Sequence, residues 1–475
     1  MKIQFGPFLI VLALLAAPLA WPQSGSGGSS SGGSSSGGSS QSGSSDSSQN
    51  GASDSSQSPE SSGPKQVFTH PEQKPPLALL DEVTAHSFIQ LGLALGTSWD
   101  SNAAAFASQG YSQTLLTVGP SIGIEQIHPG VAWQVQYSGG FMYAPTRTAN
   151  NSFNHDFTGG ALWQFSQHWQ LAANDSYLYT ADPFQTYLVN QGTPTYNQPN
   201  PTIYIPLAVL EQNSADLNLS DKLTAHDSLT FTGTENFRRY LHTSYSLYDE
   251  YTWGGLVAYQ HSFSARLLGG TAWSYTAIDI GHGTSRSGIQ MYQVFGSYKI
   301  NPHMVVTGWV GPELTNTKNI IPVLCTPYGC FKEIAHQSAW STAFGGSFGW
   351  QGVRNAASID FSKQVTDGGG LLGVVRLYVA DASFRRQLTP KWNFSAGLSY
   401  GSNLGISTLY AHRHLDALTG TVTLVRQISP AWYVSGQYLR FYQKQANIYT
   451  AQVPKWTDNR MQISLQYNWG HSLGR

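Results

Sequence analysis

Polar and apolar residues alternate without interruption between Asn459 and Trp469, near the end of the chain. The apolar set of this segment is Met461, Ile463, Leu465, Tyr467 and Trp469. A period of two residues is that of a β-strand with one apolar face. The same pattern recurs about eighteen times from Phe88 onward, while helical periodicity is nearly absent. Alternation also fits a soluble sheet, but its long repetition favours a closed transmembrane β-barrel, which has apolar side chains toward lipid and no free edge.

The connections between the alternating segments are of two kinds. Short ones contain Pro, Asn or Ser, suit tight turns, and are often followed at once by Trp; they are His128–Gly130, Ser166–His168, Asn301–His303, Thr389–Lys391 and Ser429–Ala431. Long ones are expected at residues 145–154, 181–210, 279–287, 315–337, 404–412 and 446–457. Bacterial barrels have short periplasmic turns and longer extracellular loops, so the strand number should be even. We expect about eighteen strands, or about sixteen as the alternative.

Two positions do not fit the simple alternation. Asp175 falls on the face predicted to meet lipid, where a carboxylate is unfavourable. The alternation also changes parity between Leu371 and Phe384, which indicates a β-bulge or a shifted register.

The composition supports a barrel. Charged residues make up only 11% of the chain and aromatic residues 13%, with 14 Trp, whereas a soluble domain usually has about 25% charged residues. Aromatic side chains gather at the two interfaces of membrane barrels. The mean hydropathy is −0.23, and no internal run of about twenty apolar residues would form a membrane helix. The net charge of −1 argues against a nucleic-acid partner.

The chain before the barrel divides into three segments. Residues 1–20 have the charged start and apolar run of a secretory signal peptide, with an uncleaved anchor helix as the alternative. Residues 21–64 are rich in Ser and Gly and are expected to be a disordered linker, either a simple tail or a tether or plug. Residues 65–86 form a Pro-containing lead-in, and residues 87–475 form the barrel.

The arrangement resembles the outer-membrane β-barrel porins, in particular the putative β-barrel porin families of unknown function in diderm bacteria. The resemblance covers roughly residues 87–475 and rests on the signal peptide, the repeated hairpin and the terminal strand with Tyr467 and Trp469. Porins commonly end on an aromatic residue that the barrel assembly machinery reads, whereas here Gly470–Arg475 follows. The resemblance implies secretion through the periplasm and residence in outer-membrane lipid.

The face opposite the apolar one should line the lumen. It is polar and sparsely charged, and the candidates for lumen-lining residues are Glu125, Gln134, Gln136, Asp156, Gln164, Thr232, Gln293, Lys299, Asp360, Gln437, Arg460, Gln462 and Gln466. A barrel of this strand number is wide enough for an aqueous channel, and such a lining should pass small hydrophilic solutes with weak selectivity. An export or assembly channel with periplasmic partners, for example for exopolysaccharide, and a structural or adhesive barrel are the alternatives.

The sequence gives no reason to expect an enzyme or a cofactor. No Gly-x-Ser-x-Gly elbow, His-Glu-x-x-His helix, P-loop or dinucleotide fingerprint occurs in a suitable context. No catalytic or metal-binding residue is therefore predicted. Monomeric and homo-oligomeric channels share the same strand pattern, so the pattern leaves the assembly state open.

The two cysteines, Cys325 and Cys330, are separated by four residues. Secretion places them in an oxidising compartment, which favours a small disulfide within a loop. A metal site with His336 is the alternative, but it lacks further ligands in the sequence.

Overall fold

The computed structural model describes residues 87–102, 112–128, 130–145, 152–182, 202–203, 208–241, 247–326, 329–406, 414–446 and 456–472, without the side chains of 321–333, 445–446 and 472. The predicted signal peptide, linker and lead-in (residues 1–86) lie outside this part. The strands are β1 Phe88–Asp100, β2 Gln113–His128, β3 Val131–Tyr143, β4 Ser152–Gln164, β5 Trp169–Thr180, β6 Val209–Lys222, β7 Asp227–Leu241, β8 Glu250–Ser262, β9 Leu267–Ile280, β10 Ser285–Asn301, β11 Met304–Thr326, β12 Gly329–Gln351, β13 Asn355–Thr366, β14 Val375–Thr389, β15 Trp392–Gly405, β16 His414–Gln427, β17 Trp432–Ala446 and β18 Trp456–Ser472.

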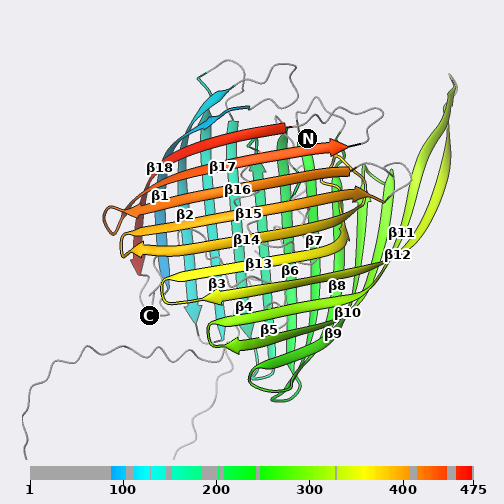
Figure 1. Cartoon of the computed structure of the whole chain (residues 1–475), viewed down its shortest axis with the longest axis horizontal. Helices are drawn as coiled ribbons and strands as arrows, with labels where there is room; N and C mark the ends of the chain where they lie inside the picture. Colours follow the sequence, from blue (N-terminus) through cyan, green and yellow to red (C-terminus); the bar gives the residue numbers. More distant parts are fainter. Residues whose placement is uncertain are drawn as a thin grey trace, which may run out of the picture. The chain divides into compact units, whose positions relative to one another are not determined.

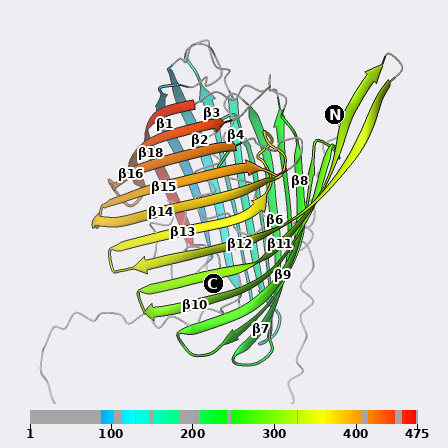
Figure 2. The same ribbon diagram turned by 45° about the vertical axis from the view of Figure 1, so that its right-hand side comes forward.

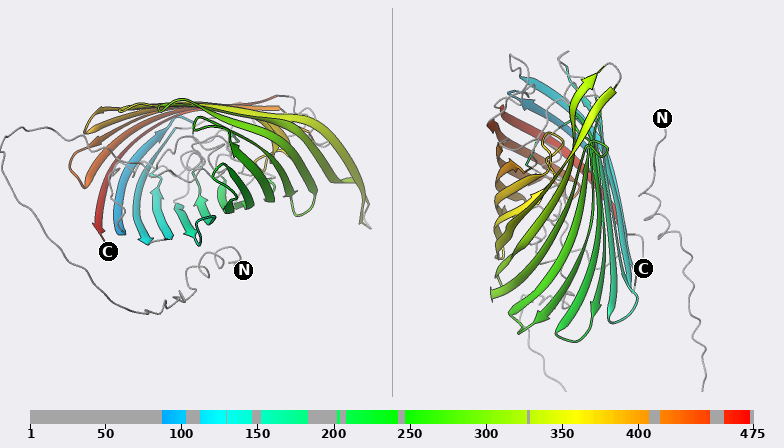
Figure 3. Two further views of the ribbon diagram at one scale, coloured as in Figure 1. Left: turned by 90° about the horizontal axis from the view of Figure 1, so that it is seen from below. Right: turned by 90° about the vertical axis from the view of Figure 1, so that its right-hand side faces the viewer.

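These elements form one closed antiparallel barrel. The sheet has 18 strands, each paired with its neighbours in sequence, and β1 pairs with both β2 and β18 to close the ring. Figures 1 and 3 show the strands surrounding a common interior. The predicted barrel and strand number are therefore confirmed. Within the described segments, no helix is long and apolar enough to cross a membrane.

The register of β1 and β18 assigns the two faces. Leu91 lies opposite Trp469 and Leu95 opposite Leu465, whereas Asp100 lies opposite Arg460. Leu91, Leu93 and Leu95 are exposed, while Asp100 and Arg460 are buried. Because successive side chains of a strand point to opposite faces, the apolar set faces outward and the polar set inward. The outward set of β18 is the one that the alternation predicts.

The short connections contain side chains that stabilise turns. At Asn301–His303 the backbone N–H of His303 donates to Asn301 Oδ1 over 2.8 Å. At Ser166–His168 the Ser166 hydroxyl oxygen accepts hydrogen bonds from the backbone N–H groups of His168 and Trp169. Such Asx and Ser turns reverse the chain locally. All five of the predicted short connections lie between consecutive strands.

The connection expected at residues 315–337 was wrong. β11 and β12 are 23 residues each and pair continuously through most of that range. Figures 1 and 2 show this hairpin extending well beyond its neighbours. Both faces of a strand that leaves the membrane can be polar, so such a strand need not show the alternation that predicts one. The connection expected at 279–287 is also shorter, because β9 ends at Ile280 and β10 begins at Ser285.

The two irregular positions have separate explanations. Asp175 does face outward, opposite Ala215, and its Oδ1 accepts a hydrogen bond of 2.7 Å from Asn213 Nδ2, which keeps this buried carboxylate paired. The change of parity after Leu371 needs no β-bulge, because β14 keeps one register with β13 and β15 from Val375 to Phe384. Its first apolar residues, Val375, Leu377 and Val379, are buried on the inward face, whereas the later ones face outward. Residues 371–374 belong to a connection, so their pattern is not that of a strand.

Candidate functional site in the barrel interior

Every residue predicted to line the lumen lies on the inward face by strand register. Gln293, Asp360 and Arg460 are buried, Gln134, Gln164 and Lys299 are exposed, and Glu125, Gln136, Asp156, Thr232, Gln437, Gln462 and Gln466 are intermediate. The register brings Glu125 opposite Gln134 and Gln437 opposite Gln462. The others are spread around the ring and do not form one cluster.

Arg460 on β18 is the centre of a first buried ion cluster. Its Nη1 lies 2.6 Å from Asp182 Oδ2, and its Nε lies 3.4 Å from Asp100 Oδ1. Its Nη2 also donates to Ser98 Oγ over 3.2 Å. Asp182 follows β5, which is not a neighbour of β18 in the sheet. The connection after β5 therefore begins by crossing toward a distant part of the inner wall.

Arg238 on β7 is the centre of a second cluster. Its Nη1 lies 3.6 Å from Glu250 Oε2 and 3.4 Å from Asp367 Oδ1. Asp367 follows β13, so this connection also reaches a strand that is not its neighbour. The Tyr240 hydroxyl donates to the carbonyl oxygen of Gly369 over 2.7 Å and holds the same connection.

Two glycines permit this connection to turn inside the barrel. Gly369 and Gly370 have φ values of +63° and +77°, a region that L-residues with a side chain rarely adopt. A Cβ on Gly370 would also overlap the Tyr240 ring, and one on Gly369 would crowd Ile203. The connection is thus packed tightly against both β7 and the segment 202–203.

An apolar cluster joins the two inward connections. Ile203 and Leu372 pack with inward residues of β14 to β18, namely Val375, Leu415, Ala417, Leu439, Phe441 and Trp456. These inward apolar side chains were missed by the sequence reasoning, which assigned function to polar inward residues only. Their signal was present, since Leu439 and Phe441 share the inward register of Gln437.

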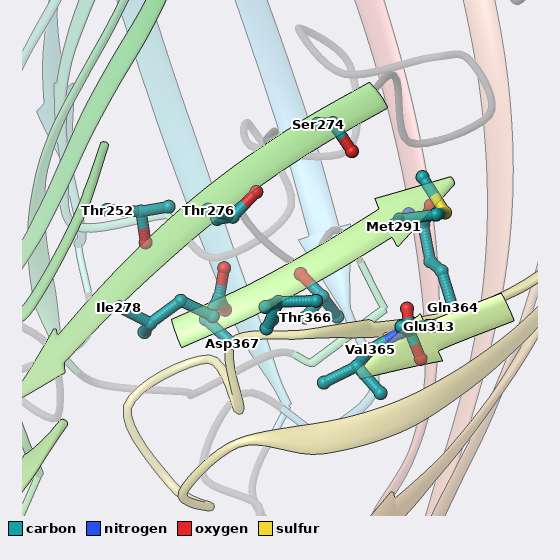
Figure 4. Close-up of a pocket in the computed structure, with 11 residues that line it drawn as sticks. Thr252, Ser274, Thr276, Ile278, Met291, Glu313, Gln364, Val365, Thr366 and Asp367 are labelled. Carbon is teal, nitrogen blue, oxygen red and sulfur yellow. The ribbon is translucent and has the colours of Figure 1, made fainter. Parts of the chain in front are cut away.

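A pocket lies between the inward face of β8 to β11 and the end of β13. It encloses about 430 Å³, including the part open to solvent, and is lined by Thr252, Ser274, Thr276, Ile278, Ile289, Met291, Glu313, Gln364, Val365, Thr366 and Asp367. Figure 4 shows the hydroxyl side chains Thr252, Ser274 and Thr276 of β8 and β9, with the carboxylates of Glu313 and Asp367 at other parts of the lining.

Glu313 is fixed in this pocket by two hydrogen bonds. Its Oε1 accepts from Ser341 Oγ over 2.6 Å and its Oε2 accepts from the backbone N–H of Val365 over 3.0 Å. Pairing of β12 with β13 ends at Phe344 and Lys363. The last residues of β13 consequently separate from β12, stay paired with β14 and approach Glu313, which closes one side of the pocket.

Carboxylates outnumber cations on the inward face of the described strands. The carboxylates are Asp100, Glu125, Asp156, Asp216, Glu250, Glu313, Asp360, Asp381 and Asp458, and the cations are Lys222, Arg238, Lys299, Arg385 and Arg460. The inward connections add Asp182 and Asp367. A cavity lined by one sign of charge raises the local concentration of ions of the other sign.

No metal site follows from these acidic residues. Among the described side chains, no group of three or more His, Cys, Asp or Glu is placed to hold a metal ion. Cys325 and Cys330 lie directly opposite each other in the register of β11 and β12, in the part where side chains are not described, so the disulfide stays a prediction.

Comparison with known proteins adds little to this geometry. No family model matches the chain, and no curated protein matches it. Among solved structures, OccAB2 of Acinetobacter baumannii is 11% identical, with a TM-score of 0.42 and coverage of 81% of this chain and 98% of that chain.

Two further structures score similarly. OccK2 (OpdF) of Pseudomonas aeruginosa is 8% identical, with a TM-score of 0.40 and coverage of 80% of this chain and 98% of that chain. The ferric-catecholate import receptor Fiu of E. coli K12 is 8% identical, with a TM-score of 0.44 and coverage of 81% and 82%. Such low similarity does not support an inference about function, which is therefore drawn from the chain's own residues.

The chain's own geometry defines its class. The ring of strands is closed, many of its outward residues are apolar and exposed, and its inward residues are largely polar and mostly buried or half-buried. Only helices and closed barrels satisfy the backbone in a bilayer, and barrels with this alternation are those of outer membranes. The described chain is an outer-membrane β-barrel.

Proposed function

We propose that this barrel is a channel through which small hydrophilic solutes cross the outer membrane passively. The observation that supports this most strongly is the inward face, where amide, hydroxyl and carboxylate groups continue from β1 to β18. A wall that only separated lipid from a packed core would be expected to be apolar on both faces. A barrel of 18 strands has an interior large enough for water and solutes.

The interior also explains why large solutes should be excluded. The connections that begin at Asp182 and Asp367 are held to distant walls by Arg460 and Arg238. Asp182 and residues 367–374 therefore lie within the interior, and we infer that they narrow the path there. Passage is therefore proposed for small solutes, and we infer that selectivity is set where these connections meet the wall.

Liposome swelling tests this proposal directly. Vesicles containing the folded protein are diluted into isotonic solutions of a pentose, a disaccharide or a large dextran. We expect rapid swelling with the pentose, slower swelling with the disaccharide and none with dextran. Swelling rates equal to those of protein-free vesicles for all three solutes would contradict a passive channel.

An export channel with periplasmic partners is the second candidate. The apolar cluster of Ile203, Leu372 and Phe441 favours it, because it joins the two inward connections firmly. An export channel held closed in this way would conduct only after the cluster is opened. Swelling that is absent in the native protein but appears in Ile203→Ser would favour this second function.

A further inference from the structure

Among the described residues, one buried oxygen of the pocket in Figure 4, Ser274 Oγ, and one on the neighbouring strand β10, Gln293 Oε1, lack hydrogen-bond partners. Ser274 on β9 is 1% exposed, and Gln293 on β10 is 4% exposed. Ser274 lines the pocket, and Gln293 lies two residues after the lining Met291 on the same inward face. Buried polar groups are nearly always paired in native proteins, so these acceptors point to a group that the protein itself does not supply.

The same region carries an excess of negative charge. Glu313 is 2% exposed and lines the pocket together with Asp367. Glu250, which is also buried, lies two residues before the lining Thr252 on the inward face of β8. Arg238 pairs with both Asp367 and Glu250, whereas Glu313 has hydrogen bonds but no cation beside it among the described residues. Buried charges are stable when paired, and a cationic ligand would supply the missing charge.

Apolar side chains complete the pocket. Ile278, Ile289 and Met291 contribute side chains to its lining, beside the hydroxyl groups of Thr252 and Thr276. A ligand that fits this lining has a charged end that donates hydrogen bonds and a short apolar body. A bare metal ion fits less well, because hard cations take six or more oxygen ligands and the described side chains offer no such group.

We propose that this pocket binds small organic ammonium cations and thereby makes the channel prefer them. An ammonium group has three N–H donors and no acceptor, which suits Ser274 Oγ and the neighbouring carboxylate oxygens. The volume of about 430 Å³ includes space open to solvent, so the enclosed part accommodates only a small charged group, and the rest of the ligand would extend toward the opening. This inference rests on the proposed channel function and deepens it by naming a solute class.

Calorimetric titration of the folded full-length protein in detergent tests the site. The probe is n-butylammonium chloride, and the matched controls are 1-butanol and sodium butyrate at equal ionic strength. We expect saturable heat with n-butylammonium and none with the uncharged or anionic analogue. Equal binding of 1-butanol would overturn the proposal, because it would show that the apolar lining alone binds the chain of the probe.

Two variants locate the binding. Glu313→Gln is expected to weaken n-butylammonium binding about tenfold or more, since hydrogen bonds to charged groups contribute most. Ser274→Ala should weaken it about three- to tenfold. Ser274 Oγ has no partner among the described residues, so Ser274→Ala breaks no hydrogen bond there and keeps the test valid if Glu313→Gln does not fold.

The matched control is Glu125→Gln, an inward carboxylate on β2 outside the pocket lining. It should leave binding unchanged. An equal loss in Glu125→Gln would overturn the site, because it would show that binding follows the general negative potential of the interior. Calorimetry needs no current through the barrel, so binding without conduction would reject the channel alone, and conduction without binding would reject this site alone.

Discussion

Arg460 Nη1 lies 2.6 Å from Asp182 Oδ2, although the two residues are separated by 278 positions in the chain. The side chains are 8% and 5% exposed. Because Asp182 directly follows β5 and Arg460 lies on β18, this pair ties the end of β5 to a distant part of the wall. A buried ion pair of this kind fixes position more than it adds stability.

Replacing Arg460 should release the connection after β5. Arg460→Gln leaves Asp182 and Asp100 buried without their shared cation. Removing one partner of a buried ion pair lowers the free energy of unfolding by about 3–5 kcal/mol. We expect lower stability to urea and a larger, noisier single-channel current, because the connection would no longer be held. Lys299→Gln is the control, since Lys299 is an exposed inward cation. Unchanged stability and current in Arg460→Gln would show that the pair does not hold the connection.

The assignment of faces predicts opposite effects at adjacent residues. Ile463 is 61% exposed on the outward face of β18, and Gln462 is intermediate on the inward face. Ile463→Arg should destabilise the folded barrel in lipid by about 2–4 kcal/mol if it lies near the bilayer midplane. Gln462→Arg should fold normally. Urea unfolding in lipid vesicles measures both, and equal tolerance of the two substitutions would contradict the facing.

Asp175 and Asn213 form a polar pair on the outward wall and provide a separate test. Asn213→Leu removes the donor to Asp175 Oδ1 and should cost about 1–3 kcal/mol, the usual effect of leaving a buried polar group unpaired. The double variant Asp175→Leu with Asn213→Leu should recover most of this loss, because neither polar group remains. The free energies of unfolding of the native protein, the two single variants and the double variant give the interaction energy between Asp175 and Asn213. A double variant less stable than Asn213→Leu alone would reject this explanation.

The cysteine pair can be tested by thiol counting. Cys325 and Cys330 lie opposite each other in the register of β11 and β12, as cross-strand partners that a disulfide could join. We expect no reaction with a maleimide in the denatured, unreduced protein and full reaction after reduction. Labelling of both cysteines before reduction would reject the predicted disulfide.

The sequence predicted the barrel well because alternation reports directly on which face meets lipid. The facing of β1 and β18 agrees with this pattern, since Leu95 lies opposite Leu465 on the outer face. It could not predict the long β11–β12 hairpin, since strands beyond the membrane need not alternate. Asp175 was recognised as outward, but its pairing with Asn213 depends on the register between β5 and β6, which one sequence does not specify.

The interior was predicted less well for a physical reason. Inward polar residues can be predicted because they occupy every second position of a strand, but the partners of Arg460 and Arg238 come from connections after β5 and β13. Contacts across the interior between strands that are not neighbours leave no periodic signal. The pocket depends on the same kind of contact, because the end of β13 approaches Glu313 only after it leaves β12.

Single-channel recording in a planar bilayer tests the central claim most directly. The folded protein is added to one side at symmetric salt, and current is recorded at fixed voltage. A passive channel predicts steady open steps of uniform size in the native protein. A folded, protease-resistant barrel that inserts but gives no steps would contradict the claim and favour a closed export channel or a structural role.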